Sequence, residues 1–267
     1  ADIHFNRALA LKAIEAGADC IRLNPGNIGG PDKVAEVAAL ANKHNTPMRI
    51  GVNSGSLPKH LHALERENSV EALVTAATEF VALMESLDFT NFKVSIKSTN
   101  VPNTIAANRL LSDRIPYPLH LGITEAGTKW SGSLKSAVGL GTLLADAIAC
   151  LALQDPITAC SVVPIPGHRH SRRGFDALDG LVVRAQRDLA QRGIPVRIVR
   201  LLRTRSDYRP AKTLGRVDRQ RSLDGAFQAR APRAPLRRLI VVDDVITTGT
   251  TIAEGVRALA ACGLPVH

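Results

Sequence analysis

Two groups of residues in this 267-residue chain have the types and spacing that suit phosphate binding. The first is a single run, Asp243–Thr251 (DDVITTGTT), which follows the apolar segment Leu236–Val242 and precedes a predicted helix. The second is a set of charged and amide side chains that recurs along successive predicted strands within residues 1–148. Each group predicts a binding site for a small anionic molecule.

The Asp243–Thr251 run combines two carboxylates with a turn rich in Thr and Gly. Backbone N–H groups of such a turn, together with the helix N-terminus, form an anion site. Gly249 lets the backbone approach a ligand closely, and hydroxyl donors come from Thr247, Thr248, Thr250 and Thr251. Asp243 and Asp244 would repel phosphate, so they face something else, and a pair of ribose hydroxyls matches them. The alternative is an ordinary strand, turn and helix with a capped start.

The second set follows a regular alternation of strands and helices. Its members are Asp2, His4, Arg22, Asn24, Arg49, Asn53, Lys97 and Glu125. In a (β/α) barrel the ends of successive strands converge on one mouth, where chemistry occurs. Arginine contacts phosphate in a bidentate manner, so two Arg, a Lys and a His on one rim suit a phosphate ester. Taken singly, each residue fits a solvated strand end, but recurrence over five units favours a shared site.

Apolar periodicity places the elements that must position these residues. We predict strands at Ala1–Phe5, Cys20–Asn24, Met48–Asn53, Phe92–Lys97 and Pro118–Glu125. Between them we predict helices at Arg7–Ala16, Pro31–His44, Val70–Leu87, Thr104–Ile115 and Gly132–Ile148, with Ser69 as the cap of the third. This alternation predicts an α/β fold with a parallel sheet, as part of a TIM-type barrel or an open sheet.

The remainder of the chain predicts a second, smaller parallel α/β domain. We expect strands at Cys160–Pro166, Val196–Leu201 and Leu236–Val242, and helices near residues 176–192 and 252–261. A basic loop, Gly167–Arg173, follows the first of these strands, and Arg203–Arg221 is expected to be a loop.

Charge divides the chain at the same place. Residues 1–148 hold 14 basic and 14 acidic residues, whereas residues 149–267 hold 19 Arg, one Lys and 10 acidic residues. The net charge of +10 therefore lies after residue 148. The change from Lys to Arg indicates two segments of separate origin, which we predict to be domains 1–148 and 149–267.

Composition narrows the class of protein. Aromatic residues make up only 3% of the chain, so stacking platforms are scarce and specific nucleic-acid binding is not expected. No apolar run approaches the ~20 residues of a membrane span, so no membrane association is expected. Four cysteines, Cys20, Cys150, Cys160 and Cys262, lack metal-type spacing; they indicate reduced thiols and a cytoplasmic protein. No metal ligands are predicted.

The segments ADIHF, IRLNPGNIGG, RIGVNSGSL, FKVSIKS and PLHLGITEAG resemble the barrel domain of 4-hydroxy-3-methylbut-2-en-1-yl diphosphate synthase, of the methylerythritol phosphate route to isoprenoids. The resemblance covers residues 1–148. It implies that the second set holds a cyclic diphosphate substrate, with Glu125 as the acid/base candidate. It also implies a [4Fe-4S] cluster, but three cysteines and a glutamate on a further domain hold that cluster in the family. This chain lacks that set and several barrel strands, so binding without reduction is expected.

Residues 157–264 resemble a competence protein F-like type I phosphoribosyltransferase, through VVPIPGHRHSRRGF, RSLDGAF and the Asp243–Thr251 run. The resemblance implies phosphoribosyl diphosphate (PRPP) with Mg²⁺, the ribose on Asp243 and Asp244, and the 5′-phosphate on Thr247–Thr251. It places Arg172 and Arg173 of the basic loop near the diphosphate. The family's usual Gln and Asn are replaced by Ala211 and Ser222.

The sequence is therefore interpreted as a fusion of a truncated synthase barrel and a PRPP-binding domain. Two alternatives stay open: a non-catalytic module that binds PRPP, or a non-functional hybrid from an artefactual gene join.

Overall fold

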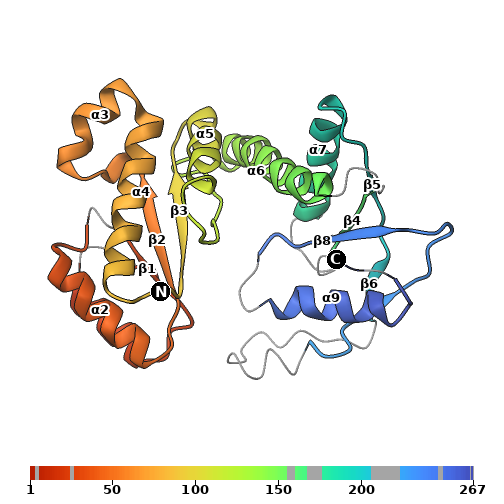
Figure 1. Ribbon diagram of the computed structural model, residues 1–267, viewed down its shortest axis with the longest axis horizontal. Helices are drawn as coiled ribbons and strands as arrows, with labels where there is room; N and C mark the ends of the chain where they lie inside the picture. The colour runs from red at the N-terminus through yellow and green to blue at the C-terminus, as the bar shows by residue number, and fades with distance from the viewer. Residues whose placement is uncertain are drawn as a thin grey trace. The chain divides into compact units, whose positions relative to one another are not determined.

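The computed structural model describes residues 1–3, 6–24, 27–154, 160–166, 176–205, 223–245, 249–264 and 266. The chain divides into two compact units, residues 1–143 (unit 1) and 144–267 (unit 2). Each unit contains a parallel sheet with helices beside it, so the predicted mixed α/β class is confirmed (Figure 1).

Unit 1 is built on a parallel sheet in the order β1-β2-β3. The strands are β1 (Ile21–Leu23), β2 (Met48–Asn53) and β3 (Phe92–Lys97). Two isolated parallel bridges, Asp2 with Arg22 and Val94 with Leu119, continue the arrangement at both edges. The predicted five-strand order is therefore present, but the first and fifth members are reduced to bridges in the described residues.

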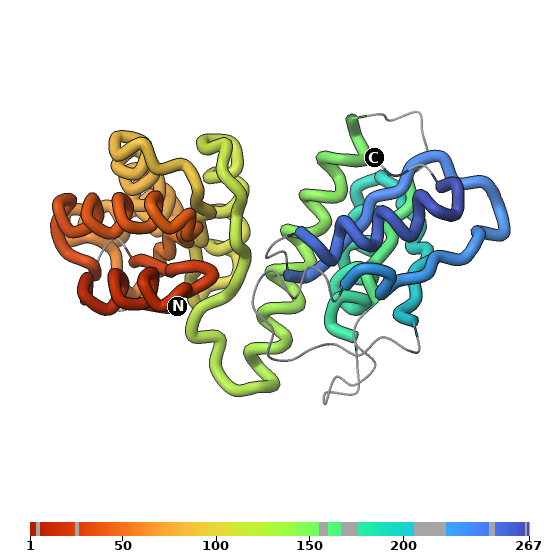
Figure 2. The backbone as a smooth tube through the Cα atoms, turned by 90° about the horizontal axis from the view of Figure 1, so that it is seen from below, coloured from red at the N-terminus to blue at the C-terminus, as the bar shows by residue number. Residues whose placement is uncertain are grey.

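Helices alternate with these strands, as the apolar periodicity predicts. They are α1 (Arg7–Glu15), α2 (Pro31–Lys43), α3 (His62–Glu67), α4 (Ser69–Ser86) and α5 (Val101–Ser112), with 3-10 turns η1 (Ser54–Ser56) and η2 (Lys59–Leu61). α1 and α2 lie side by side (Figure 2). Pro31 occupies the first turn of α2. The predicted cap of α4 is wrong by one residue, because Asn68 accepts the Glu71 N–H, at 3.1 Å, and Ser69 is already helical.

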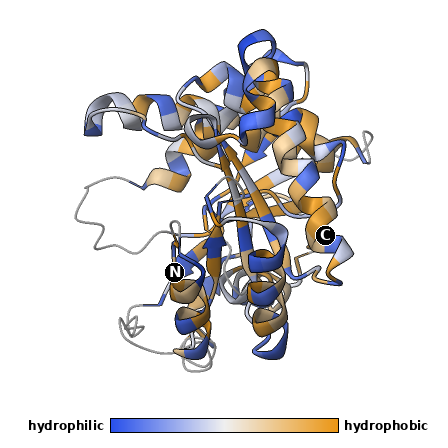
Figure 3. Ribbon diagram, turned by 90° about the vertical axis from the view of Figure 1, so that its left-hand side faces the viewer, coloured by the Kyte–Doolittle hydropathy of each residue, from blue (hydrophilic) through white to orange (hydrophobic). Residues whose placement is uncertain are grey.

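One face of the unit 1 sheet forms the core with the helices. Alternate strand residues such as Leu23, Ile50 and Val94 are at most 1% exposed and join apolar helix residues in one cluster. Figure 3 shows hydrophobic colours along the strands and hydrophilic colours on parts of the surrounding helices. Because side chains alternate along a strand, the intervening residues, including Arg22 and Arg49, point to the other face.

Helix α6 (Lys129–Leu153) runs past the predicted end at Ile148 and crosses the boundary between the units. It is long and apolar enough to cross a membrane by length and composition alone, so the expectation that no apolar stretch approaches this length is wrong. Of its most apolar window, 39% is buried inside the protein. Ala145 and Ile148 belong to the hydrophobic core of unit 2, whereas Trp130, Leu134 and Val138 of the same helix are exposed.

Unit 2 has a parallel sheet in the order β5-β4-β8 and a separate antiparallel pair, β6 with β7. The elements are β4 (Cys160–Pro164), α7 (Ala177–Gln191), β5 (Val196–Ile198), β6 (Leu202–Thr204), β7 (Phe227–Ala229), β8 (Arg238–Val242) and α9 (Thr250–Ala260). The three strands predicted for this part of the chain are present with shorter bounds, β5 being reduced to three residues, and the β6–β7 pair was not predicted. Buried Glu254 of α9 accepts the Phe227 N–H at 3.3 Å and pairs with Arg257, which fastens α9 to β7.

Two helical glycines of unit 2 allow a matched test of this packing. In α9, a Cβ on Gly255 would lie 2.6 Å from Ile165 Cδ1, a buried side chain, whereas a Cβ on Gly180 of α7 would meet nothing within 4 Å. Gly255→Ala should lower the free energy of unfolding by about 1–3 kcal/mol through overpacking. Gly180→Ala should raise it by roughly 0.5–1 kcal/mol. Urea unfolding followed by circular dichroism measures both, and equal effects of the same sign would contradict the packing described.

Candidate functional site

The polar face of the unit 1 sheet carries a row of cations that lie directly opposite one another. The strand register aligns Arg22 of β1 with Arg49 of β2, and Arg49 with Lys93 of β3. The bridge at the sheet edge adds Asp2 beside Arg22. Like charges directly opposite each other on a sheet are destabilising. The row therefore has a surplus of positive charge that an anion would relieve.

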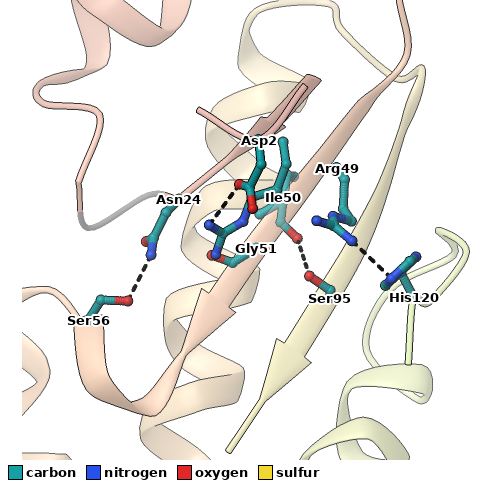
Figure 4. A network of polar contacts seen from close by, with 9 residues as sticks. Asp2, Asn24, Arg49, Ile50, Gly51, Ser56, Ser95 and His120 are labelled. Carbon is teal, nitrogen blue, oxygen red and sulfur yellow. Dashed lines mark hydrogen bonds and ion pairs between the residues drawn. The ribbon is translucent and has the colours of Figure 1, made fainter. Parts of the chain in front are cut away.

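Arg22 is the best satisfied member of this row. Its side chain is only 9% exposed and its Nη1 donates to Asp2 Oδ1 at 3.1 Å (Figure 4). Its Nη2 reaches the Gly51 carbonyl at 3.4 Å and, with the Asn53 amide oriented to satisfy both its neighbours, Asn53 Oδ1 at 3.2 Å. A Cβ on Gly51 would lie 2.4 Å from Arg22 Nε, so this glycine gives the guanidinium its room.

Arg49 makes a different kind of contact. Its Nη1 lies 2.9 Å from Nε2 of His120, which comes from the segment beside β3 (Figure 4). Burial, then the positive charges of Arg49, Lys97 and Lys93, lower the pKa of His120 to about 4. The contact therefore joins a guanidinium to a neutral imidazole at pH 7.

Lys97 lies at the C-terminal end of β3, in register with Asn53. A Cβ on Gly122 would be 2.8 Å from Lys97 Cε, so the lysine side chain crosses this glycine closely. Burial, followed by the charges of Arg49 and Arg22, lowers the pKa of Lys97, while Asp2 opposes that shift. Burial and two neighbouring cations therefore outweigh the Asp2 carboxylate in their effect on the lysine.

A second part of this face gathers around the turn after β2. Asn24, only 2% exposed, donates from Nδ2 to Ser56 Oγ at 2.7 Å. Glu125 lies near the same turn, because its Oε1 is 3.9 Å from the position of a Cβ on Gly55. Glu125 is exposed and has a φ of 45°, an uncommon conformation for a residue other than glycine. Such a conformation occurs where the surrounding structure fixes the residue.

The structure thus brings most of the second set to one face of the sheet. Asp2, Arg22, Arg49, Asn53 and Lys97 share the polar face, and Asn24 and Glu125 both flank the turn after β2. His4 lies outside the described residues. Sequence reasoning missed Lys93 and His120, because it considered mainly the C-terminal ends of the strands. The even spacing of Lys93 from Lys97 is the signal that could have found the lysine.

The described part of the Asp243–Thr251 run also has the predicted order. Asp243 and Asp244 follow β8 directly, and the Asp244 N–H donates to Asp243 Oδ1 at 2.9 Å. Gly249, with a φ of 75°, is the N-cap of α9, so Thr250 and Thr251 form the first helical turn. Thr247, Thr248, Arg172 and Arg173 lie outside the described residues.

Burial and the neighbouring Asp244 raise the pKa of Asp243 to about 6. The backbone N–H of Asp244 works in the opposite direction. The net effect shows that the folded chain disfavours the charged form of Asp243. A carboxylate kept in such surroundings at a strand end is a candidate ligand-binding group.

The cysteines do not form a site for an iron–sulfur cluster. Cys20 precedes β1, Cys150 lies in α6, Cys160 in β4 and Cys262 after α9. Within the described ranges, no group of three or more His, Cys, Asp or Glu could hold a metal ion. Burial also raises the pKa of Cys160, which favours the thiol over the thiolate that binds metals. The residues described do not fit a [4Fe-4S] cluster.

Comparison with known proteins assigns the first unit. A family model described as the GcpE TIM-barrel domain matches residues 1–150. The 4-hydroxy-3-methylbut-2-en-1-yl diphosphate synthase (flavodoxin) of Geobacter sulfurreducens is 55% identical over 148 residues, 55% of this chain and 42% of that protein. The protein of the same name from Idiomarina loihiensis is 46% identical over 189 residues, 69% of this chain and 48% of that protein. The chain spans less than half the length of these relatives.

The raised pKa of Asp243 predicts a pH-dependent stability of unit 2. The pKa of Asp243 is higher in the folded chain than in the unfolded chain. Its contribution to the free energy of unfolding is therefore fully present below about pH 4 and is lost as the pH rises through about 6. Asp243→Asn keeps an oxygen for the Asp244 N–H but carries no charge. At pH 7.5 it should raise the free energy of unfolding by about 1–2 kcal/mol, discounted for partial exposure, and at pH 4 by much less.

Urea unfolding at both pH values measures this difference. The exposed Asp224→Asn is the control and should change stability by less than about 0.5 kcal/mol. A loss of stability in Asp243→Asn at pH 7.5 would show that the carboxylate is well accommodated and would remove this argument for a binding role.

Proposed function

The chain belongs to the GcpE TIM-barrel family, and from this membership we propose that unit 1 binds the cyclic diphosphate substrate of the isoprenoid-pathway synthase. The observation that carries the proposal is the in-register row of Arg22, Arg49 and Lys93. Lys97 adds a fourth cation to the same face. Cations brought together at a cost to the fold are expected where a multiply charged anion binds.

The members of the face have different proposed roles. Arg49 and Lys97 would contact the diphosphate, Arg49 through two N–H groups and Lys97 as a point charge. Arg22, held by Asp2, would contribute positive electrostatic potential to the site and would orient the Asn53 side chain through a hydrogen bond. Asn24 and Glu125 flank the turn after β2, where Glu125 is the candidate for proton transfer to or from the bound substrate.

We infer binding rather than reduction for this unit. The family reaction that the resemblance implies is a two-electron ring opening, and an iron–sulfur cluster supplies its electrons. The described cysteines do not fit that cluster. Unit 1 would therefore bind the diphosphate and neutralise its charge without reducing it.

Isothermal titration of the full chain with the cyclic diphosphate tests this proposal. Arg49→Gln should weaken binding by about ten- to a hundredfold, the worth of a hydrogen bond to a charged group. Lys43→Gln removes the same charge from an exposed position at the end of α2 and should change affinity by less than about twofold. Iron–sulfur reconstitution should add no reductive turnover. Absence of binding by the unaltered chain, or equal losses in both variants, would contradict the proposal.

For unit 2 we propose PRPP binding with Mg²⁺ at the end of β8. Two observations support this proposal. Asp243 and Asp244 are adjacent carboxylates, and the raised pKa of Asp243 means that its charged form is disfavoured. Helix α9 begins directly after Gly249, close in sequence to this pair. Vicinal ribose hydroxyls would donate to the carboxylates, and the phosphate would meet the N-terminus of α9. Thr247, Thr248, Arg172 and Arg173, which lie outside the described residues, would complete this site. A non-catalytic module and an artefactual join of the two units are the alternatives.

Titration of the chain with PRPP and Mg²⁺ distinguishes these possibilities. Asp244→Ala should abolish the heat of binding, whereas the control Asp224→Ala should retain it. If the unaltered chain gives no heat, unit 2 is not a PRPP site. If it binds PRPP but releases no diphosphate with candidate acceptors, the non-catalytic module is favoured over the transferase.

A further inference from the structure

His120 is a half-buried titratable group that the proposed roles above leave unused. Its backbone N–H donates to the Val94 carbonyl at 2.7 Å, which fixes the residue beside β3. Its ring reaches across to Arg49 on β2, with Nε2 and Nη1 2.9 Å apart (Figure 4). The imidazole therefore contacts the guanidinium that would bind the ligand.

The chemistry of this contact fixes the state of the ring. Arginine has donors and no acceptor, so Nε2 must be the acceptor and the ring proton must be on Nδ1. The charged groups that act on the ring are Arg49 from β2 and Lys97 and Lys93 from β3, and all three are positive. These charges, added to burial, keep the imidazole neutral at pH 7.

We propose that His120 is a proton-accepting member of the anion site, which takes up one proton when a phosphate-bearing ligand binds and releases Arg49 to that ligand. The proposal rests on the diphosphate-binding function proposed above. The proton comes from solvent and binds Nε2 once the Arg49 N–H has turned to the ligand. The imidazolium then becomes a further cation that faces the anion.

The driving force follows from the charges already described. A bound dianion offsets the repulsion that Arg49, Lys97 and Lys93 exert on a protonated ring, so it raises the pKa of His120 from its value of about 4. By linkage, the ligand must then bind more tightly as the pH falls. For one coupled proton, affinity changes by up to about tenfold per pH unit between the free and bound pKa values.

Sulfate is the first probe, because it stays a dianion across the range of about pH 5 to 8 and any proton taken up must bind the protein. Histidine-labelled full chain is titrated by NMR at constant ionic strength, and the His120 ring signal is assigned from its loss in His120→Gln. With saturating sulfate the pKa of His120 should rise by at least about one unit. The affinity for sulfate should fall as the pH rises, and His120→Gln should lose this dependence below about pH 8.

His60→Gln is the matched control, since His60 is exposed and pairs with Glu79 away from the strands. It should keep the pH dependence of the unaltered chain. Any dependence that remains in His120→Gln at higher pH belongs to Lys97, whose pKa is also lowered.

The outcomes separate this inference from the proposed function. If sulfate and inorganic pyrophosphate bind but the His120 titration does not move, the inference is wrong and the anion site stands. If neither anion binds, both are wrong. Should His120→Gln fail to fold, the titration of His120 in the unaltered chain, with and without sulfate, decides the question alone.

Discussion

The strand register of unit 1 is the constraint on which its polar face depends. Arg22, Arg49 and Lys93 stand opposite one another because Leu23, Ile50 and Val94 stand opposite one another on the buried face. A slip of one residue would exchange the two faces and drive the cations into the core. Burial of the apolar face therefore fixes an arrangement of charges that the cations alone would not adopt.

Two glycines and one carboxylate lower the steric and electrostatic cost of placing these cations on one face of the sheet. Gly51 of β2 leaves room for the Arg22 side chain, and Gly122, in the segment after the Leu119 bridge, leaves room for the Lys97 side chain. Asp2 balances Arg22, and its influence on Lys97 is weaker than that of burial and the two arginines. The remaining surplus of charge is held on rigid strands rather than on loops, which keeps it in place before a ligand arrives.

The sequence predicted those parts of the fold in which local pattern and packing agree. β2 and β3 have the predicted bounds, because apolar and polar residues alternate from Met48 and from Phe92 until each strand ends. α6 was predicted too short, since the apolar run continues through Leu153 without a residue that ends a helix. The β6–β7 pair was missed because its strands have only three residues each and β6 overlaps the polar segment Arg203–Arg221, whose composition predicts a loop. Lys93 was missed although its even spacing from Lys97 places it on the same face, and the contact of His120 with Arg49 was missed because a contact between distant parts of the chain is not visible in one sequence.

The two arginines of the polar face show why charge alone does not identify a ligand group. Arg22 already has a carboxylate, a carbonyl and an amide oxygen as acceptors, so a ligand would gain little by contacting it. Arg49 contacts a neutral imidazole, which is a weaker partner for a cation than a carboxylate or phosphate. In the ligand-free chain His120 accepts a hydrogen bond from Arg49. When an anion binds, His120 would instead take up a proton, and Arg49 would then donate to the anion. Arg22 therefore has a structural role in the polar face, whereas Arg49 and His120 are the residues whose contacts would change when a ligand binds.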